Sequence, residues 1–198
     1  MANRLAPAEG ALEDFEARCE ALRTRLRQDD FLNNRGLGNE VGIYTFCYDP
    51  TLEPQARSFV ARLKADETLP CRIREVNLYD VLISICESKK ILAGIPAMER
   101  KKGSEGLKEQ LKKIATPSAF VKAMAAEPAE PGDVVVITGV GEVYPFMRVH
   151  NILDNIQQEG IYEGVPVVVA YPGRFDGQTL SLFGRLTDGN YYRAFDLI

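Results

Sequence analysis

The sequence predicts an α/β fold in which a mostly parallel central sheet is flanked by helices. Short apolar runs rich in valine and isoleucine alternate with segments whose apolar residues recur at every third or fourth position. That order is typical of strand–helix–strand units, whose parallel strands need a crossover helix. Two runs, 134–137 and 165–171, are almost wholly apolar, as expected of strands buried on both faces. A lysine-rich middle segment breaks the alternation and predicts a helical excursion from the sheet.

Length and charge restrict the classes of protein to consider. With 198 residues the chain is long enough to bury a substantial core, and we expect a single α/β domain over residues 1–198. A net charge of -4 argues against non-specific nucleic-acid binding by the whole surface. No apolar run approaches the ~20 residues of a membrane helix, and residues 1–16 lack the apolar core of a signal peptide. We therefore expect a cytoplasmic protein without a membrane partner.

The first elements can be placed from apolar spacing and proline. An amphipathic helix is predicted over residues 9–30 from a stripe at spacings of three and four. The stripe consists of Leu12, Phe15, Cys19, Leu22 and Leu26. A strand follows over 41–48, and Pro54 marks the first turn of the next helix, where proline is favoured. Residues 72–78 read as a second strand, and 81–86 as part of the helix after it.

The excursion is predicted over residues 87–131, with short helices around 107–114 and 117–124 and a basic tip. Its most prominent cations are Lys101, Lys102, Lys112 and Lys113. Such lysines contact DNA phosphates in some proteins. A solvated helix face is the alternative that we favour.

The last part returns to the α/β pattern. A strand over 134–137 leads to a helix that ends at Gly160, and residues 165–171 form the next strand. Residues 181–186 are a candidate short strand. The tail, 190–198, is aromatic and apolar, and we expect it to dock onto the body rather than fray.

Cysteine usage predicts reduced thiols and no metal site. Cys19, Cys47, Cys71 and Cys86 form no closely spaced pair, and His150 is the single histidine. Zinc sites built from cysteine and histidine need a different spacing. We expect four buried thiols, and we assign no metal ligand and no cofactor.

The loop after residues 134–137 is the strongest candidate for a site, because open α/β sheets bind ligands at the carboxyl ends of their strands. It carries Gly139, Gly141, Glu142 and Arg148. It has no phosphate-loop lysine and no nucleophile–base pair, so we assign no catalytic residue. The glycines are simple turn residues on the alternative reading. Arg148 is expected to pair with Glu142 or with a carboxylate or phosphate of a partner.

Three other polar residues have a functional and a structural interpretation. His150 is a general-base candidate, but a hydrogen-bonded structural role is more common. Asp49 and Asp80 follow predicted strands, as metal-binding carboxylates do. Each also suits the cap of the helix that follows, and we favour that role.

The segment Asn190-Tyr191-Tyr192-Arg193 is the most unusual part of the tail. Tyrosine and arginine together are typical of interface hot spots. Aromatic side chains also stack on bases. Packing of the tail on its own domain is the third possibility.

Three ordered segments carry a resemblance. They are Gly36-Leu37-Gly38-Asn39-Glu40 with Tyr48-Asp49-Pro50; Thr138-Gly139-Val140-Gly141-Glu142-Val143-Tyr144-Pro145 with Arg148; and Pro172-Gly173, Asp176-Gly177-Gln178, Leu182-Phe183-Gly184 and Asn190-Tyr191-Tyr192-Arg193-Ala194-Phe195. In this order they resemble the BrxB family, the small subunit of BREX phage-defence systems, over about residues 31–198. Cys47 departs from the family pattern, in which we expect an acid, and this weakens any paired-carboxylate metal site there.

The resemblance implies a cytoplasmic bacterial defence component and no established catalytic residues. It also implies neighbours: a PglZ-type protein of the alkaline-phosphatase superfamily, a large ATPase and a DNA methyltransferase. We expect a non-catalytic adaptor that binds the PglZ-type protein, with the ATPase and methyltransferase as further candidate partners. The predicted partner or ligand surface is Glu142, Arg148, Asp176, Asn190, Tyr191, Tyr192 and Arg193.

Two other functions stay open. One is a divergent nucleotide-binding or hydrolysing domain that uses the loop 139–148, and the missing phosphate-loop lysine argues against it. The other is DNA binding through the lysine-rich excursion, which the acidic net charge predicts to be weak or absent.

Overall fold

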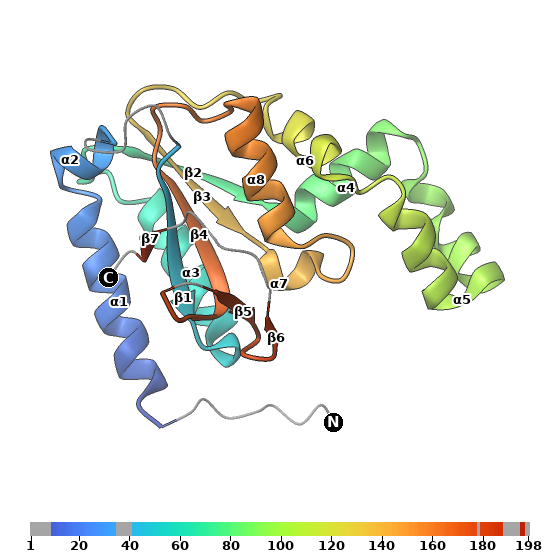
Figure 1. The fold of residues 1–198 in the computed structure, drawn as a ribbon, viewed down its shortest axis with the longest axis horizontal. Coiled ribbons are helices and arrows are strands. Elements are labelled where there is room, and N and C mark those ends of the chain that lie inside the picture. Colours follow the sequence, from blue (N-terminus) through green and yellow to red (C-terminus); the bar gives the residue numbers. More distant parts are fainter. Residues whose placement is uncertain (1–8, 35–40, 178, 188–194, 197–198) are drawn as a thin grey trace.

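The computed structural model describes residues 9–34, 41–177, 179–187 and 195–196, and it confirms the α/β class (Figure 1). The strands are β1 (Ile43–Tyr48), β2 (Arg72–Asn77), β3 (Asp133–Thr138), β4 (Val167–Phe175), β5 (Leu180–Leu182), β6 (Leu186–Thr187) and β7 (Phe195–Asp196). The helices are α1 (Ala11–Arg25), α2 (Asp29–Leu32), α3 (Glu53–Lys64), α4 (Leu78–Ser88), α5 (Ile95–Lys112), α6 (Pro117–Met124), α7 (Val140–Val143) and α8 (Val149–Glu159). Two 3-10 turns, Pro50–Leu52 and Leu92–Gly94, precede α3 and α5.

The main sheet has the strand order β2-β3-β4-β1-β7, and each of these neighbours pairs in parallel. β5 pairs antiparallel with the end of β4, and β6 pairs antiparallel with β5. β4 lies between β3 and β1, which agrees with its almost wholly apolar sequence. β1 lies between β4 and β7, so an early segment of the chain is flanked by two late ones.

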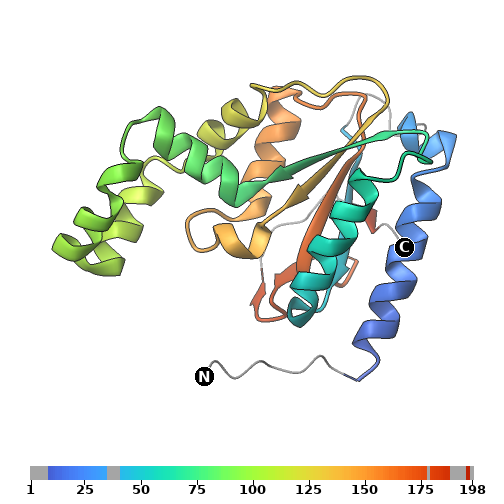
Figure 2. The same cartoon turned by 180° about the vertical axis from the view of Figure 1, so that it is seen from behind.

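Alternation along the strands divides the interior into two cores. Val134, Val136 and Val168 belong to the core under α1 and α3. Val135 and Ile137 belong to the core under α4, α6, α7 and α8. Figures 1 and 2 show these two helical layers on opposite faces of the sheet.

Aromatic packing fixes α1 on its face of the sheet. The Phe15 ring lies 5.9 Å from Phe46 of β1 and 6.4 Å from Phe59 of α3, both edge-on. Aromatic pairs in this geometry add stabilisation beyond the area they bury. The predicted stripe is therefore correct for Phe15 and Leu22, whereas Leu12 at its start is 48% exposed. The helix is shorter than predicted, because α2 begins separately at Asp29.

The excursion is helical, as predicted, but α5 is longer than the expected short helix. It contains a break at Gly103, whose backbone angles of φ 71 and ψ 169 are not helical. A side chain rarely adopts this conformation, so glycine is required there. Three residues later, in the second half of α5, a Cβ at Gly106 would lie 2.7 Å from the Cβ of Lys102. Two glycines thus shape α5 into two helical halves, which project from the body in both Figure 1 and Figure 2.

The segment 181–186 is not one strand, as was predicted, but the greater part of the β5–β6 hairpin. Phe183 and Gly184 adopt positive φ values of 56 and 65, and this reverses the chain. Only the glycine of this pair signals a turn in the sequence, which explains the error. The predicted docking of the tail is confirmed for residues 195–196, which pair in parallel with β1 as β7.

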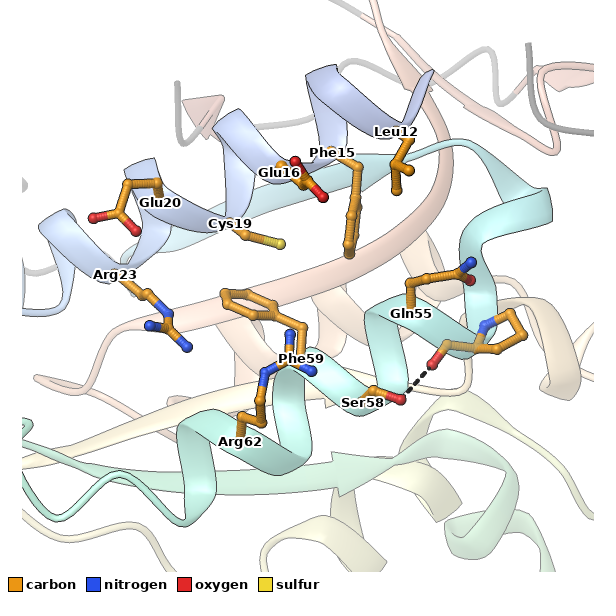
Figure 3. A pocket seen from close by; sticks show the side chains of 11 residues that line it. Leu12, Phe15, Glu16, Cys19, Glu20, Arg23, Gln55, Ser58, Phe59 and Arg62 are labelled. Atoms are coloured by element: carbon orange, nitrogen blue, oxygen red, sulfur yellow. Dashed lines mark hydrogen bonds between the residues drawn. The ribbon is translucent and has the colours of Figure 1, made fainter. Parts of the chain in front are cut away.

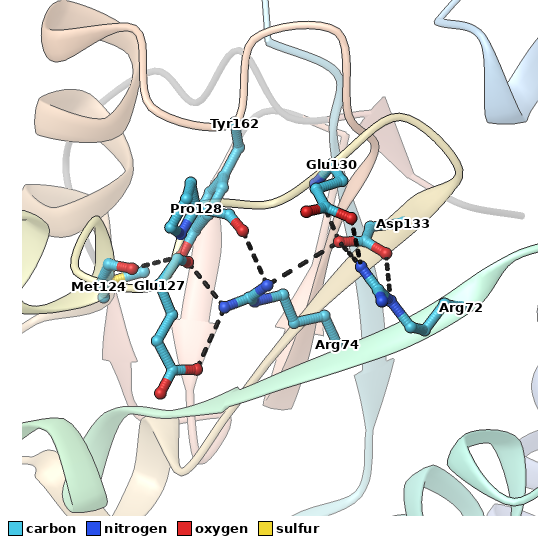
Figure 4. Close-up of polar contacts among 8 residues, drawn as sticks. All are labelled: Arg72, Arg74, Met124, Glu127, Pro128, Glu130, Asp133 and Tyr162. Carbon is cyan, nitrogen blue, oxygen red and sulfur yellow. Dashed lines mark hydrogen bonds and ion pairs between the residues drawn. The ribbon is translucent and has the colours of Figure 1, made fainter.

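Two arginines hold the return of the excursion at the start of β3 (Figure 4). The buried carboxylate of Asp133 accepts hydrogen bonds from Nε and Nη2 of Arg72, at 2.7 and 3.1 Å, and from the backbone N–H of Glu130 at 2.9 Å. Arg74 donates to the carbonyl oxygens of residues 127–128, both at 2.8 Å. Charge-assisted bonds of this kind are stronger than neutral ones. They fasten residues 127–133 to β2.

We predict that Asp133→Asn destabilises the fold in a pH-dependent way. Burial alone raises the pKa of Asp133, but the hydrogen bonds from Arg72 and Glu130 and the charges of Arg72 and Arg74 outweigh it and lower that pKa. The ionised carboxylate of Asp133 therefore contributes fully to the free energy of unfolding above the unfolded pKa of roughly 4. This contribution is lost as the pH falls through the folded pKa. The variant should lose about 1–2 kcal/mol of unfolding free energy at neutral pH. Urea unfolding should show this difference shrinking below about pH 4.

The matched control is Glu130→Gln, which removes an exposed carboxylate from the same cluster. Its unfolding curve should follow that of wild type both at neutral pH and below about pH 4, because exposed ion pairs contribute little to stability. An Asp133→Asn difference that is equally large at low pH would show that the charge of the carboxylate is not the cause.

Candidate functional site

The carboxyl ends of β1, β2, β3 and β4 meet at one edge of the sheet, since these strands are parallel. β1 leads to α3 on one face, whereas β3 leads through α7 to α8 on the other face. A cleft of 650 Å³ lies beside β1 and β4, lined by their ends, the start of α1 and the β5–β6 turn. In open α/β sheets, ligands bind where the connection after one strand runs to one face of the sheet and the connection after another runs to the opposite face. Asp49, Arg174 and Arg185 supply charged groups to this cleft.

Glu142 is part of an ion-pair chain at this edge. Its carboxylate lies 2.7 Å from Nη2 of Arg57 on α3, and Nε of Arg57 lies 3.2 Å from Glu53. The Tyr48 hydroxyl donates to Glu53 at 2.6 Å. The hydrogen bond to Glu142 is the main cause of the raised pKa of Arg57, and burial followed by the charge of Glu53 raises the pKa of Tyr48. Of the two partners expected for Arg148, Glu142 is excluded, because its carboxylate pairs with Arg57 and ties α7 to α3.

Arg148 lies at the N-terminal cap position of α8. Its guanidinium is 5.9 Å from the centre of the Tyr144 ring and donates to the carbonyl of Leu186 at 3.5 Å. A second pocket, of 420 Å³, lies between this loop and Lys112 at the end of α5. His150 is half-buried in the first turn of α8. The loop thus links α8 to the β5–β6 hairpin.

Gly139 has a structural reason to be glycine. It begins α7 in the left-handed conformation, with φ 72, and a Cβ there would lie 2.4 Å from Oδ1 of Asn77. That oxygen caps α4 by accepting from the backbone N–H of Tyr79 and of Asp80, at 2.8 and 3.2 Å. The prediction that Asp80 caps this helix is therefore wrong, and Asn77 does so. The turn interpretation of Gly139 accounts for its position.

The remaining predicted site residues do not gather in one site but lie in different parts of the chain. Asp49 accepts from the N–H and hydroxyl of Thr51, at 2.9 and 2.6 Å, and so caps the turn that leads to α3. Asp176 accepts from the N–H of Thr179 at 2.7 Å in the connection between β4 and β5. Asn190, Tyr191, Tyr192 and Arg193 lie outside the described residues.

The four cysteines are free thiols, but only Cys47 and Cys86 are buried. The prediction of four buried thiols is wrong for Cys19 and Cys71, which are half-buried at the edge of the core under α1 and α3. Even so, burial is the main cause that raises the pKa of each to about 11. Thiols with a raised pKa are poor nucleophiles at neutral pH. Across residues 9–34, 41–177, 179–187 and 195–196, no group of three or more His, Cys, Asp or Glu could hold a metal ion.

The predicted basic residues of the excursion are exposed on and just after α5. Lys112 pairs with Glu109 at 3.6 Å, and Lys108 pairs with Glu105. Acids of the same helix thus neutralise part of this charge. No helix in the part of the chain that the structure describes combines the length and apolar character needed to cross a membrane.

Three residues that fix the position of Glu142 were not predicted from the sequence as site residues: Tyr48, Glu53 and Arg57. Glu53 and Arg57 are four residues apart on a helix, and this spacing is a recognisable ion-pair signal. The partner of Arg57 across the sheet edge has no such local signal.

Comparison with known proteins gives a consistent family. Residues 74–197 match the family model described as BREX protein BrxB. A BREX protein BrxB of Bacillus cereus (strain H3081.97) is 39% identical over 188 residues, which cover 91% of this chain and 96% of the relative. One of Escherichia coli O9:H4 (strain HS) is 31% identical over 194 residues, or 93% of this chain and 92% of the relative. No solved structure matches the chain.

Proposed function

Since the chain belongs to the BrxB family of BREX proteins, we propose that it acts as a non-catalytic adaptor in a BREX antiphage defence assembly. The first-choice partner is a PglZ-type protein of the alkaline-phosphatase superfamily, followed by the ATPase and the methyltransferase of the system. The predicted surface, with Glu142, Arg148, Asp176 and the segment 190–193, is part of this proposal.

One observation supports the adaptor role most strongly. Glu142, the acid of the loop at the carboxyl edge of the sheet, is engaged by Arg57 at 2.7 Å. Arg57 in turn contacts Glu53 of its own helix. A general base needs a carboxylate that can accept a proton from a substrate, whereas a paired carboxylate joins two helices. Glu142 is therefore better suited to hold α7 against α3 than to act as a general base.

Co-purification tests the proposal. The tagged chain, expressed with the other components of its own BREX system, should retain the PglZ-type protein through gel filtration. The same preparation without the chain supplies the background. If phage protection requires the chain but none of the components co-purifies with it, the adaptor proposal is wrong.

We predict that the isolated protein hydrolyses neither ATP nor DNA. The loop 139–148 lacks a phosphate-loop lysine, and its acid is ion-paired. Phosphate release and plasmid cleavage are measured with Mg²⁺ or Mn²⁺ present. Turnover that tracks the protein through purification and disappears in Glu142→Ala or Arg148→Ala would favour the nucleotide-hydrolysing alternative.

We also predict weak duplex binding. Residues 87–131 carry nine lysine or arginine residues against six glutamates, so the excursion is only mildly basic within an acidic chain. Fluorescence anisotropy with labelled duplex at physiological salt should give a Kd of about 1 µM or weaker. Tighter binding that is lost when Lys101, Lys102, Lys112 and Lys113 are changed to alanine would instead identify a DNA-binding subunit.

A further inference from the structure

The pocket of 420 Å³ between the end of α5 and the loop 144–148 differs in charge from the larger cleft beside β1 and β4. Of the described residues that line this pocket, only Lys112 and Arg148 carry a charge, and both are cations. Acids and arginines together line the cleft, and Figure 3 shows the same mixture along a groove between α1 and α3. The lining therefore favours an anionic ligand in the pocket, whereas it favours neither sign of charge in the cleft or the groove.

The walls of this pocket are apolar and partly open. Tyr144, Pro145 and Phe146 line it and are half-buried, so each keeps some surface that a ligand can cover. The backbone N–H of Phe146 donates to the carbonyl of Val143 at 2.9 Å, and the Tyr144 ring lies edge-on to Phe183 at 6.2 Å. The loop is thus held by its own contacts before a ligand arrives. Such preorganisation lowers the cost of binding.

The two cations come from different helices. Lys112 lies in the last turn of α5, and Arg148 is at the N-terminal cap position of α8. The Tyr144 ring, at 5.9 Å, and the carbonyl of Leu186, at 3.5 Å, position the guanidinium of Arg148. Lys112 contacts Glu109 at 3.6 Å, but both side chains are exposed, and such pairs contribute little. A carboxylate in the pocket would gain more, since both cations attract it.

The polar lining is better suited to a peptide than to a nucleotide. The amide of Asn151 offers a donor and an acceptor, as the backbone of an extended peptide does. Phosphate chains are typically bound by glycine-rich loops whose backbone N–H groups point at the ligand. The nearby glycines do not line this pocket, because Gly139 faces Asn77 and Gly141 faces Phe183.

We propose that this pocket binds an extended segment of the PglZ-type partner in which a carboxylate adjoins an apolar or aromatic side chain. The apolar side chain would pack against Tyr144 and Phe146, and the carboxylate would lie against Lys112 and Arg148. The inference rests on the proposed adaptor function and adds the surface and the chemistry of recognition.

The test is the Kd between the full-length chain and the PglZ-type protein of its own system, measured for three variants. Lys112→Glu reverses a charge of the pocket at an exposed position. Asn151→Asp adds a carboxylate to the pocket in the first turn of α8. A negative charge there stabilises a helix, so the thermal unfolding temperature of this variant should equal or exceed that of wild type. Lys113→Glu is the matched control, because it makes the same change of charge one residue later, outside the pocket.

Lys112→Glu and Asn151→Asp should each weaken binding by about tenfold or more, the size expected when a close charge pair across an interface is lost. Lys113→Glu should bind like wild type. Binding of wild type should also weaken as salt is added, because the attraction is partly electrostatic.

The possible failures are distinguishable. If wild type does not bind, the adaptor function fails and this inference fails with it. If both pocket variants bind like wild type, or if Lys113→Glu weakens binding as much as Lys112→Glu, the pocket assignment fails and the adaptor function stands. Calorimetry with ATP should give no binding. ATP that binds wild type but not Lys112→Glu would make this a nucleotide site, and the proposed occupant would be wrong.

Discussion

Replacing Gly173 with alanine is expected to lower the free energy of unfolding by about 3 kcal/mol or more. Gly173 pairs with Leu182 where β4 joins β5. A Cβ at this position would lie 2.2 Å from the carbonyl oxygen of Ser181 and 2.8 Å from a ring carbon of Tyr171. Overpacking in a core costs about 1–3 kcal/mol when side chains can move aside. The carbonyl belongs to the backbone of β5, so the strand itself has to move.

Urea unfolding measures this change, with Gly94→Ala as the control. A Cβ at Gly94 meets no atom within 4 Å, and its backbone does not require glycine. Alanine there should therefore be neutral or slightly stabilising. If Gly173→Ala unfolds at the same urea concentration as wild type, the close packing of β4 on β5 is not as described.

Gly139→Ala is expected to cost about 2–3 kcal/mol, for two separable reasons. An L-residue in the left-handed region costs about 1–2 kcal/mol. The new methyl group would also displace Oδ1 of Asn77, which lies 2.4 Å from its position, and loss of a helix cap costs about 1 kcal/mol. The effect would reach α4 as well as α7, because Asn77 caps α4.

Two further variants separate the causes. Gly164 has a similar φ of 75 and open space around it, so Gly164→Ala measures the backbone cost alone. In an Asn77→Ala background, Gly139→Ala should cost less than in wild type, since the cap is already absent and the clash is removed. Strict additivity of the two substitutions in thermal or urea unfolding would show that Gly139 and Asn77 are independent.

The elements that follow a simple period were predictable from sequence. The burial of β3, β4 and one face of α1 can be predicted from their residue types, because apolar residues follow each other in the two strands and recur every three or four positions in the helix. The break in α5 was not predictable, because a glycine inside a helical pattern is tolerated more often than it marks a break. The cap of α4 was assigned to Asp80 instead of Asn77, because both residue types cap helices and only the backbone chooses between them.

The candidate site was predictable in position but not in contacts. Parallel strands bring their carboxyl ends together, so the loop after β3 had to lie at that edge. The partner of Glu142 is Arg57, which is distant in sequence and follows a strand that is not a neighbour of β3. No local pattern encodes such a pair. The pocket lined by Lys112 and Arg148 was missed for the same reason, since β3 separates its two walls in the sequence.

The position of β1 determines the order in which the molecule can assemble during synthesis. β1 ends at residue 48, yet its neighbours begin at residues 167 and 195. The ribosome therefore completes most of the chain before β1 can pair on either side. Contacts between such distant segments slow folding, and an unpaired apolar strand is open to association with other chains. A nascent chain that stalls before residue 167 would carry an unpaired β1. Among the parts of this protein, we expect β1 to be the first that is bound by chaperones for extended apolar segments.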